Sequence, residues 1–118
     1  MSLILVVDDE PDIQNALQMI LVLEGYDVIT AFDGEEGLRL AIEKQPHLII
    51  SDIMMPRMNG TEMCQRLRQD PKTRDIPIIV SSSIEPLAES RDWDLFLRKT
   101  TNLDELLSAI QRLSKSRA

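Results

Sequence analysis

Short apolar runs alternate along the chain with segments of helical spacing, and this alternation constrains the fold more than any other feature. The expected strands are 3–7, 26–32, 47–51, 76–81 and 95–98, and the expected helices are 12–24, 35–45, 61–69 and a last one from Thr101. Strands that are apolar throughout are buried on both faces. Strands that alternate with helices are joined by right-handed crossovers into a parallel sheet. We therefore predict a doubly wound α/β fold with a five-stranded parallel sheet.

Turn and cap residues set the expected boundaries of the helices. Gly25 ends the first helix, and Asp33 forms a turn or cap before the second helix. Asp33 also follows the second strand, but we expect it to lie further out than the other acids at strand ends. Thr101 and Asp104 have the spacing of a capping box, so the last helix is expected to start at Thr101. The polar and basic residues 114–118 are expected to form the end of the domain or the start of a linker.

Composition narrows the class of protein. A length of 118 residues fits one domain spanning 1–118, and 43% hydrophobic against 3% aromatic residues predicts an aliphatic core. A net charge of −7 argues against contact with nucleic acids or anionic membranes. Cys64 is the only cysteine, which fits a reducing compartment. The first apolar run is too short for a signal peptide or a membrane span, so the expected location is cytoplasmic.

Polar residues collect where the expected strands end. Asp8 and Asp9 follow the first strand, and Asp52 follows the third. The fourth strand ends at Ser81, Ser82 and Ser83, and Lys99 follows the fifth. In the flavodoxin-like strand order 2-1-3-4-5, the first and third strands are neighbours at the point where the order reverses. Three carboxylates should therefore meet there, next to a hydroxyl and an ammonium group.

This set of groups suggests a metal-assisted phosphoryl site. Like charges repel more strongly as water is excluded, so Asp8, Asp9 and Asp52 need a divalent ion and Lys99 to coexist. Oxygen ligands suit Mg²⁺ or Mn²⁺, and a carboxylate beside such an ion can attack a phosphoryl group. Taken alone, Asp8 and Asp9 would be read as an acidic loop or a helix cap. Because Asp52 and Lys99 are expected at the same edge of the sheet as Asp8 and Asp9, a metal site is favoured over a loop or a cap.

The sequence as a whole resembles a response-regulator receiver domain of two-component signalling. The resemblance rests on "ILVVDDEP" at 4–11, "LIISDIMMPRMNG" at 48–60, "IPIIVSSS" at 76–83 and "FLRK" at 96–99. These motifs span nearly the whole chain. The resemblance implies that a histidine kinase or phosphotransfer protein is one partner, and that a downstream protein or an effector domain is another.

The resemblance also implies a role for each motif residue. Asp52 would accept the phosphoryl group, Asp9 would bind Mg²⁺ directly, and Asp8 would bind it partly through water. The backbone carbonyl of Met54 would be a third protein ligand, with Asp52 itself in the coordination sphere. Lys99 would stabilise the phosphoryl oxygens.

Two residues would carry the conformational switch of the family. Ser82, five positions after Pro77, matches the switch hydroxyl, and Phe96, three before Lys99, matches the switch aromatic. Phosphorylation would then shift an existing equilibrium between two conformations.

The sequence departs from the family pattern near its fifth strand. Thr100 follows Lys99 where the family usually has proline, so the peptide bond there is expected to be trans. The stretch 82–99 is shorter than in the family, which predicts a shortened or irregular fourth helix, with Pro86 as a candidate first residue. The output face of the domain should therefore differ from that of other family members.

Two apolar side chains stand where the family controls hydrolysis. Met54 lies two residues beyond Asp52, and Ile84 lies two residues beyond Ser82. Neither side chain can orient a hydrolytic water, so we predict slow self-dephosphorylation.

Several other residues have simpler interpretations. Cys64 is expected to be a small core residue. The methionines of the loop after the third strand, Met54, Met55 and Met58, are expected to pack against the protein. For Trp93, filling of the space left by the short fourth helix and anchoring of a partner remain equal alternatives.

Other functions remain as rivals to the phosphorylated receiver, which would be a signalling switch rather than a turnover enzyme. A receiver-like interaction module with weakened or absent phosphorylation is the main alternative. A magnesium-dependent phosphatase would typically carry Asp-x-Asp at the first strand, where this chain has "DDEP". A flavodoxin-type carrier is disfavoured because three acids would repel the flavin phosphate.

Overall fold

Five parallel strands form one sheet in the order β2-β1-β3-β4-β5, which confirms the predicted fold and strand order. The computed structural model describes residues 2–83, 92–99 and 102–115. The strands are β1 (Leu3–Val7), β2 (Asp27–Ala31), β3 (Leu48–Ser51), β4 (Ile78–Ser82) and β5 (Leu95–Arg98). The helices are α1 (Pro11–Leu23), α2 (Gly34–Lys44), α3 (Gly60–Gln69) and α4 (Leu103–Lys115).

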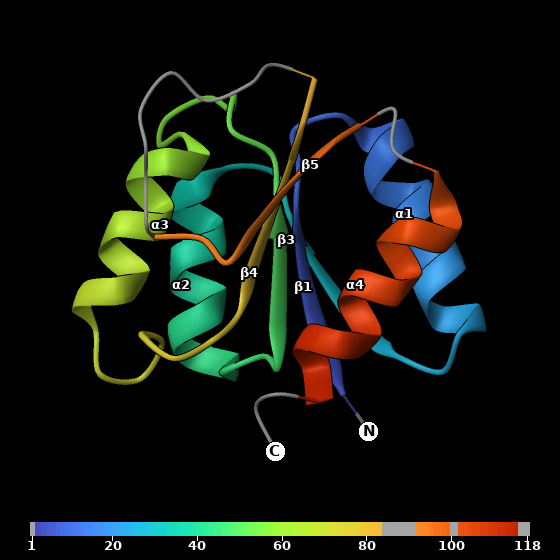
Figure 1. The fold of residues 1–118 in the computed structure, drawn as a ribbon. Coiled ribbons are helices and arrows are strands. Elements are labelled where there is room, and N and C mark those ends of the chain that lie inside the picture. The colour runs from blue at the N-terminus through green and yellow to red at the C-terminus, as the bar shows by residue number, and fades with distance from the viewer. Residues whose placement is uncertain (1, 84–91, 100–101, 116–118) are drawn as a thin grey trace.

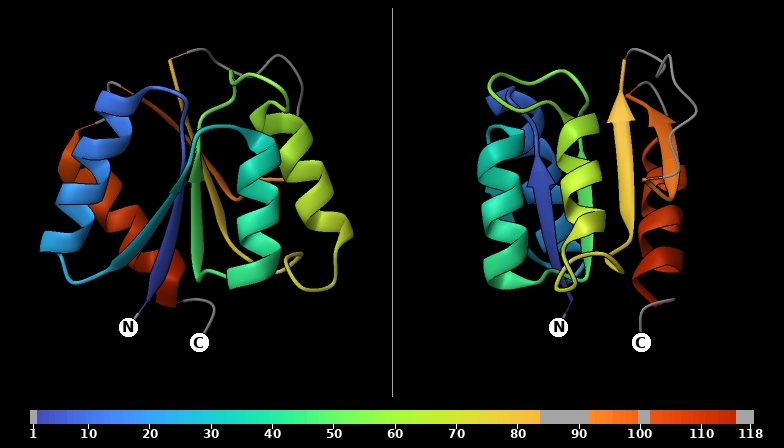
Figure 2. Two further views of the ribbon diagram at one scale, coloured as in Figure 1. Left: turned by 180° about the vertical axis from the view of Figure 1, so that it is seen from behind. Right: turned by 90° about the vertical axis from the view of Figure 1, so that its left-hand side faces the viewer.

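Two layers of helices enclose the sheet. The helices α1 and α4 cover one face, and α2 and α3 cover the other (Figures 1 and 2). Because all strands run in the same direction, their carboxyl ends lie together at the upper rim in Figure 1. Ligand sites in open parallel sheets occur at that rim. A functional site is therefore expected at this rim.

The alternation of side chains along the central strands builds a core on each face. In β1, Leu5 and Val7 join the core beneath α2 and α3, whereas Ile4 and Val6 join the core beneath α1 and α4. All four are at most 1% exposed. Each such aliphatic side chain contributes about 1.5–3 kcal/mol by leaving water. The core is mainly aliphatic, as the composition predicts.

Local capping explains where the first three helices begin. Pro11 opens α1, where its missing N–H group costs no hydrogen bond. The Asp33 carboxylate accepts a hydrogen bond of 2.8 Å from the backbone N–H of Glu36 and caps α2. The Asn59 side chain accepts one of 2.9 Å from the N–H of Glu62 and caps α3.

The start of the last helix differs from the prediction. The helix α4 begins at Leu103, and the Asn102 side chain accepts a hydrogen bond of 2.8 Å from the N–H of Glu105. The cap is thus Asn102, which competes well with threonine for this position. Thr101, the predicted first residue, lies outside the described residues.

The fourth strand also starts later than predicted. Ile76 donates its N–H to the carbonyl of Thr73 at 3.1 Å, so it belongs to the preceding turn. The strand β4 begins at Ile78, whose N–H donates to the Asp94 carboxylate at 2.7 Å. It continues to Ser82, one residue further than expected.

The region of the expected fourth helix falls mostly outside the described residues. Residues 84–91, including Ile84 and Pro86, lie outside the described residues, and so does Thr100. The shortened fourth helix and the trans bond from Lys99 to Thr100 therefore stay predictions. Trp93 is described: it is half-buried and packs against the core beneath α2 and α3. Within the described residues, no helix combines the length and apolar character that a membrane span needs.

Candidate functional site

Four acidic side chains meet at the carboxyl ends of β1 and β3. Asp8, Asp9, Glu10 and Asp52 each offer a carboxylate oxygen, and these oxygens all lie within 4.8 Å of one another. We call these four residues the acid cluster. Asp8 and Asp52 are only 3% and 7% exposed, whereas Asp9 and Glu10 face solvent. The cluster therefore combines two buried acids with two accessible ones.

The Lys99 ammonium group lies among these acids. Its Nζ is 2.9 Å from Asp52 Oδ2, 3.1 Å from Asp8 Oδ2 and 3.4 Å from Glu10 Oε1. Burial lowers the pKa of Lys99, but hydrogen bonds to Asp52 and Asp8 outweigh this effect and raise the pKa above its usual value. Lys99 is thus a fixed positive charge at neutral pH.

One lysine does not relieve the crowding of acids at this rim. Burial raises the pKa of Asp8, and the nearby charge of Asp52 raises it further. A hydrogen bond of 2.9 Å from the backbone N–H of Glu10 and the contact with Lys99 oppose this shift without cancelling it. The ionised form of Asp8 is therefore disfavoured in the fold, and a further positive charge would stabilise it.

Backbone contacts hold Asp8 in place at the end of β1. Its N–H donates to the carbonyl of Ala31 at 3.0 Å. The Gln14 amide, 4% exposed, donates to the carbonyls of Ala31 at 2.9 Å and Asp8 at 3.3 Å. Sequence analysis missed Gln14, because a lone glutamine in an amphipathic helix carries no signal of burial.

Asp52 is held by the loop that joins β3 to α3. Its N–H donates to the carbonyl of Val7 at 3.0 Å, and its Oδ1 accepts a hydrogen bond of 2.6 Å from the N–H of Ile53. The N–H of Gly60 donates to the carbonyl of Ile53 at 2.8 Å. A Cβ atom at Gly60 would collide with the Asp52 carbonyl oxygen, so this close return of the chain requires glycine.

Asp33 lies outside the acid cluster and has an arginine as its partner. Arg57 Nε donates to Asp33 Oδ2 at 2.8 Å, and Arg57 Nη2 lies 2.7 Å from the same oxygen as an ion pair. The N–H of Glu36 lowers the pKa of Asp33 most; burial opposes this shift, and Arg57 adds to it. Sequence analysis did not find this pair, because the two residues are 24 positions apart.

The other candidate residues occupy different environments around the rim. Ser82 is 1% exposed at the end of β4, and Phe96 is half-buried in β5 against the core beneath α2 and α3. Met55 and Met58 pack against the same core. The prediction that all three loop methionines pack is wrong for Met54, which is 61% exposed.

Cys64 fits its predicted place in the core. It is fully buried in α3, and burial raises the pKa of its thiol to about 12. The thiolate form is therefore scarce at neutral pH.

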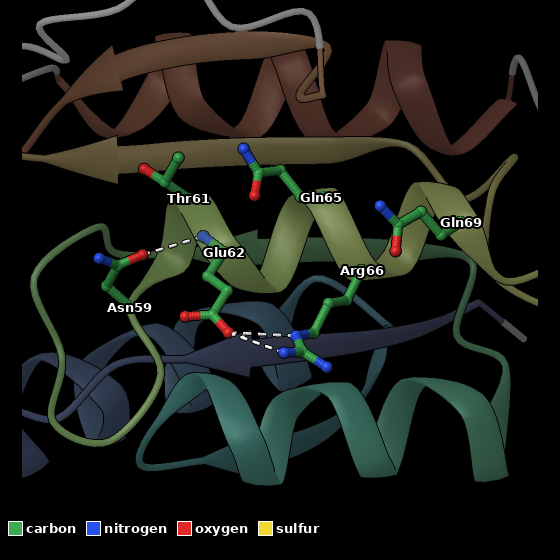
Figure 3. A pocket seen from close by; sticks show the side chains of 6 residues that line it. All are labelled: Asn59, Thr61, Glu62, Gln65, Arg66 and Gln69. Carbon is green, nitrogen blue, oxygen red and sulfur yellow. Dashed lines mark hydrogen bonds and ion pairs between the residues drawn. The ribbon is translucent and has the colours of Figure 1, made fainter.

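An open hollow also lies along the outer face of α3. Thr61, Gln65 and Gln69 form a row one helical turn apart on this face, and Glu62 pairs with Arg66 at 3.1 Å (Figure 3). Exposed pairs of this kind contribute little to stability. The hollow is lined by residues of α3 and its cap rather than by the acid cluster, so it reads as a solvated helix face.

Comparison with known proteins defines the class of protein. The chain belongs to the family of response regulator receiver domains, whose family model matches residues 4–111. It is 36% identical over 118 residues to the DNA-binding dual master transcriptional regulator RpaA of Synechocystis, covering 96% of this chain and 49% of RpaA. It is 35% identical over 115 residues to the response regulator ArlR of Staphylococcus aureus, covering 96% of this chain and 52% of ArlR. The chain thus spans about half the length of these curated relatives.

Solved structures agree with this assignment. The response regulator TrrA of Thermotoga maritima, determined in complex with Mg²⁺ and BeF, superposes with a TM-score of 0.86 at 35% identity, covering 96% of this chain and 99% of TrrA. The signal receiver domain of a histidine kinase from Syntrophus aciditrophicus gives 0.87 at 32% identity, covering 98% and 92%.

The predicted family, fold and general function are therefore confirmed. The chain is a receiver domain of the response-regulator type. Its relatives are signalling proteins, and receiver domains generally bind Mg²⁺.

Proposed function

We propose that Asp52 accepts a phosphoryl group from a histidine kinase or a phosphotransfer protein, with Mg²⁺ held by the acid cluster. One observation carries this proposal: Asp52 shares a rim of carboxylates with Asp8 and Asp9, and Lys99 Nζ lies 2.9 Å from its Oδ2. A nucleophilic carboxylate, ligands for a hard cation and a fixed ammonium group are thus present at one point. These are the parts that phosphoryl transfer to an aspartate requires.

The donor set of the acid cluster fits Mg²⁺. Its ligands are oxygens, without histidine or thiolate, which suits a hard cation such as Mg²⁺ and also Mn²⁺. Asp9, which is exposed, binds the ion directly, and Asp8 binds it partly through water. Asp52 and the backbone carbonyl of Met54 complete the protein ligands. When bound, Mg²⁺ supplies positive charge to the phosphoryl oxygens.

The protein residues then have defined roles in the transfer. An oxygen of the Asp52 carboxylate attacks phosphorus, and an O–P bond forms while the P–N bond of the phosphohistidine breaks. The electron pair of that bond returns to the imidazole nitrogen, which carries a proton in the released histidine. Lys99 donates hydrogen bonds to the phosphoryl oxygens, because its ammonium group already lies beside the acceptor.

The phosphoryl group would also move the switch residues. Ser82 ends β4 as a buried hydroxyl, and reorientation of this hydroxyl toward the phosphoryl group shifts the loop after it. Phe96 follows because it is only half-buried on the neighbouring strand β5. Phosphorylation selects one of two pre-existing conformations in this scheme.

The lifetime of the phosphorylated form would be long. Met54 is exposed next to the site and has no group that can orient a hydrolytic water. Ile84 is assigned the same role from its sequence position alone. The acyl phosphate would therefore decay slowly in the absence of a phosphatase.

Partners follow from the class of protein. A histidine kinase or phosphotransfer protein supplies the phosphoryl group, and a downstream protein or effector domain receives the signal. The net charge of −7 makes direct contact of this domain with nucleic acid unfavourable. A cytoplasmic location is consistent with these partners.

A small phosphodonor tests the proposal. Wild-type protein and Asp52→Asn are treated with phosphoramidate, with and without Mg²⁺, and examined by intact-mass spectrometry. We expect one phosphoryl mass on the wild type in the presence of Mg²⁺ and none on Asp52→Asn. Labelling that persists in Asp52→Asn, or that is unaffected by Mg²⁺, would overturn the assignment.

A further inference from the structure

The acceptor loop, residues 52–59, is held at a second point that is separate from the acid cluster. Arg57 Nε donates a hydrogen bond of 2.8 Å to Asp33 Oδ2, and Arg57 Nη2 forms an ion pair of 2.7 Å with the same oxygen. The Asp33 side chain is only 5% exposed, and its Oδ1 is fixed by the N–H of Glu36 as the cap of α2. Arg57 therefore ties the loop to a rigid element of the fold.

The next residue of the loop makes a second contact with the same place. The N–H of Gly34 donates to the carbonyl of Met58 at 2.9 Å. A Cβ atom at Gly34 would collide with that carbonyl oxygen, so the two backbones approach as closely as glycine permits. Two successive loop residues thus dock on the start of α2.

The backbone of the loop is strained at this point. Arg57 has φ of 65°, in the left-handed region that residues with a Cβ atom rarely adopt. Strained conformations of this kind persist where surrounding contacts hold them, and they cluster at functional sites. The ion pair with Asp33 is such a contact. Without it, one of the two contacts that hold the loop in this conformation is lost.

We propose that Arg57 and Asp33 form a positioning clamp for the magnesium site. This inference rests on the proposed function, because the clamp acts on ligands that function assigns. The clamped loop carries both Asp52 and Met54, whose carboxylate and carbonyl bind Mg²⁺ in the proposed site. Arg57 lies five positions after Asp52 and acts through the loop backbone. Metal sites depend on such supporting contacts as well as on the ligands themselves.

Electrostatics alone makes the opposite prediction for Arg57, which gives a sharp test. Removing a positive charge near the acid cluster should strengthen the binding of a cation. Loss of the clamp should weaken it, because the ligands on the loop are no longer held in position. Arg39 is a matched control: it lines the same hollow as Arg57, and its side chain is 62% exposed against 64% for Arg57.

The experiment measures the Mg²⁺ dissociation constant by isothermal titration calorimetry in five proteins. These are the wild type, Arg57→Gln, Arg57→Lys, Arg39→Gln and Asp33→Asn. We expect Arg57→Gln to bind Mg²⁺ about tenfold more weakly, at the lower end of what outer-shell changes cost at metal sites. Asp33→Asn keeps a capping side chain and should weaken binding in the same direction. Arg39→Gln should bind as tightly as the wild type or slightly more tightly.

Arg57→Lys separates position from charge. It keeps the positive charge but cannot form the two-pronged contact, so we expect intermediate affinity. A double variant, Arg57→Gln with Asp33→Asn, should be no weaker than the more affected single variant, because both changes break one contact. Circular dichroism at the titration temperature checks folding. If Arg57→Gln does not fold, Arg57→Lys and Asp33→Asn carry the comparison.

The outcomes distinguish the clamp from the proposed function. Folded Arg57→Gln that binds Mg²⁺ as tightly as the wild type, or more tightly, overturns the clamp alone. Equal weakening in Arg39→Gln also overturns the clamp, because the loss of affinity would then not depend on the contact between Arg57 and Asp33. A wild type that binds no Mg²⁺ overturns the proposed site and the clamp together.

Discussion

Two groups of buried acids at the same rim of the sheet have opposite electrostatic conditions. Asp33, at the start of α2, receives a backbone N–H on one oxygen and the Arg57 guanidinium on the other. Asp8 and Asp52, at the ends of β1 and β3, share one ammonium group, that of Lys99, among the residues that the structure describes. The Asp33 carboxylate thus has a partner on each oxygen, whereas the Asp8 and Asp52 carboxylates lie close together around one cation.

The difference separates an acid that supports the fold from acids that await a ligand. The pKa of Asp33 is lowered, first by the N–H of Glu36 and then by Arg57, against the effect of burial. The pKa of Asp8 is raised, chiefly by burial. Acids whose charge is not compensated by the fold are candidates for cation binding and chemistry. Changes to Lys99, Asp8 and Asp33 test the two sides of this contrast.

The largest effect is expected for Lys99→Met. Both phosphoryl stabilisation and the only ammonium contact recorded for Asp8 and Asp52 within the described residues would be lost. The rate of phosphorylation by phosphoramidate should fall by a factor on the order of 10² or more. Without Mg²⁺, the free energy of unfolding should fall by about 3 kcal/mol, because two buried carboxylates lose their shared cationic partner.

Rate measurements by intact mass and urea unfolding check this prediction. Lys72→Met, in the exposed turn after α3, is the control and should leave both quantities unchanged. If Lys99→Met is phosphorylated at the wild-type rate, Lys99 does not stabilise the phosphoryl group.

Neutral substitutions of Asp8 and of Asp33 should change the free energy of unfolding in opposite directions. In the absence of Mg²⁺, Asp8→Asn should raise the free energy of unfolding, since burial disfavours the charged form. Asp33→Ala should lower it by about 1 kcal/mol, because α2 loses its cap. Urea unfolding of both variants gives the comparison. Stability changes of the same sign would erase the contrast between the two acids.

The contrast should also appear in the pH dependence of stability. The folded-state pKa of Asp8 is raised, so its contribution destabilises the protein as pH rises from its unfolded value of 3.8 through the folded value. The advantage of Asp8→Asn over the wild type should therefore grow across this window and then level off. The pKa of Asp33 is lowered, so its stabilising contribution is present above 3.8 and is lost as pH falls through the folded value.

Urea midpoints for the wild type, Asp8→Asn and Asp33→Asn, without Mg²⁺, test both directions when the series runs from about pH 2 to about pH 7, because the Asp33 window lies below 3.8 and the Asp8 window lies above it. An advantage of Asp8→Asn that shrinks as pH rises would contradict the assignment for Asp8.

The smallest effect concerns the lifetime of the phosphorylated protein. Met54→Asn places a group that can hydrogen-bond water beside the acceptor, so decay of the phosphorylated form should become a few-fold faster. Intact-mass measurements after removal of the donor follow the decay, with Met19→Asn as an exposed control on α1. Wild-type decay within seconds would refute slow self-dephosphorylation, and an unchanged rate in Met54→Asn would exclude the role of Met54.

Sequence reasoning predicts the sheet and the family because their signals are local. Apolar runs define strands, and acids that directly follow β1 and β3 must share a rim once the strand order is known. The contact of Arg57 with Asp33 could not be predicted, because it depends on a left-handed turn within an otherwise irregular loop. Asn102 was overlooked because Thr101 and Asp104 offered an equally good capping pattern one residue earlier.

Calorimetric titration of Mg²⁺ into wild-type protein and Asp8→Asn tests the central claim most directly. The crowding of Asp8, Asp9 and Asp52 predicts one saturable site in the wild type, and a large loss of affinity in Asp8→Asn despite its greater stability. No heat of binding in the wild type, or equal affinity in the two proteins, would contradict it.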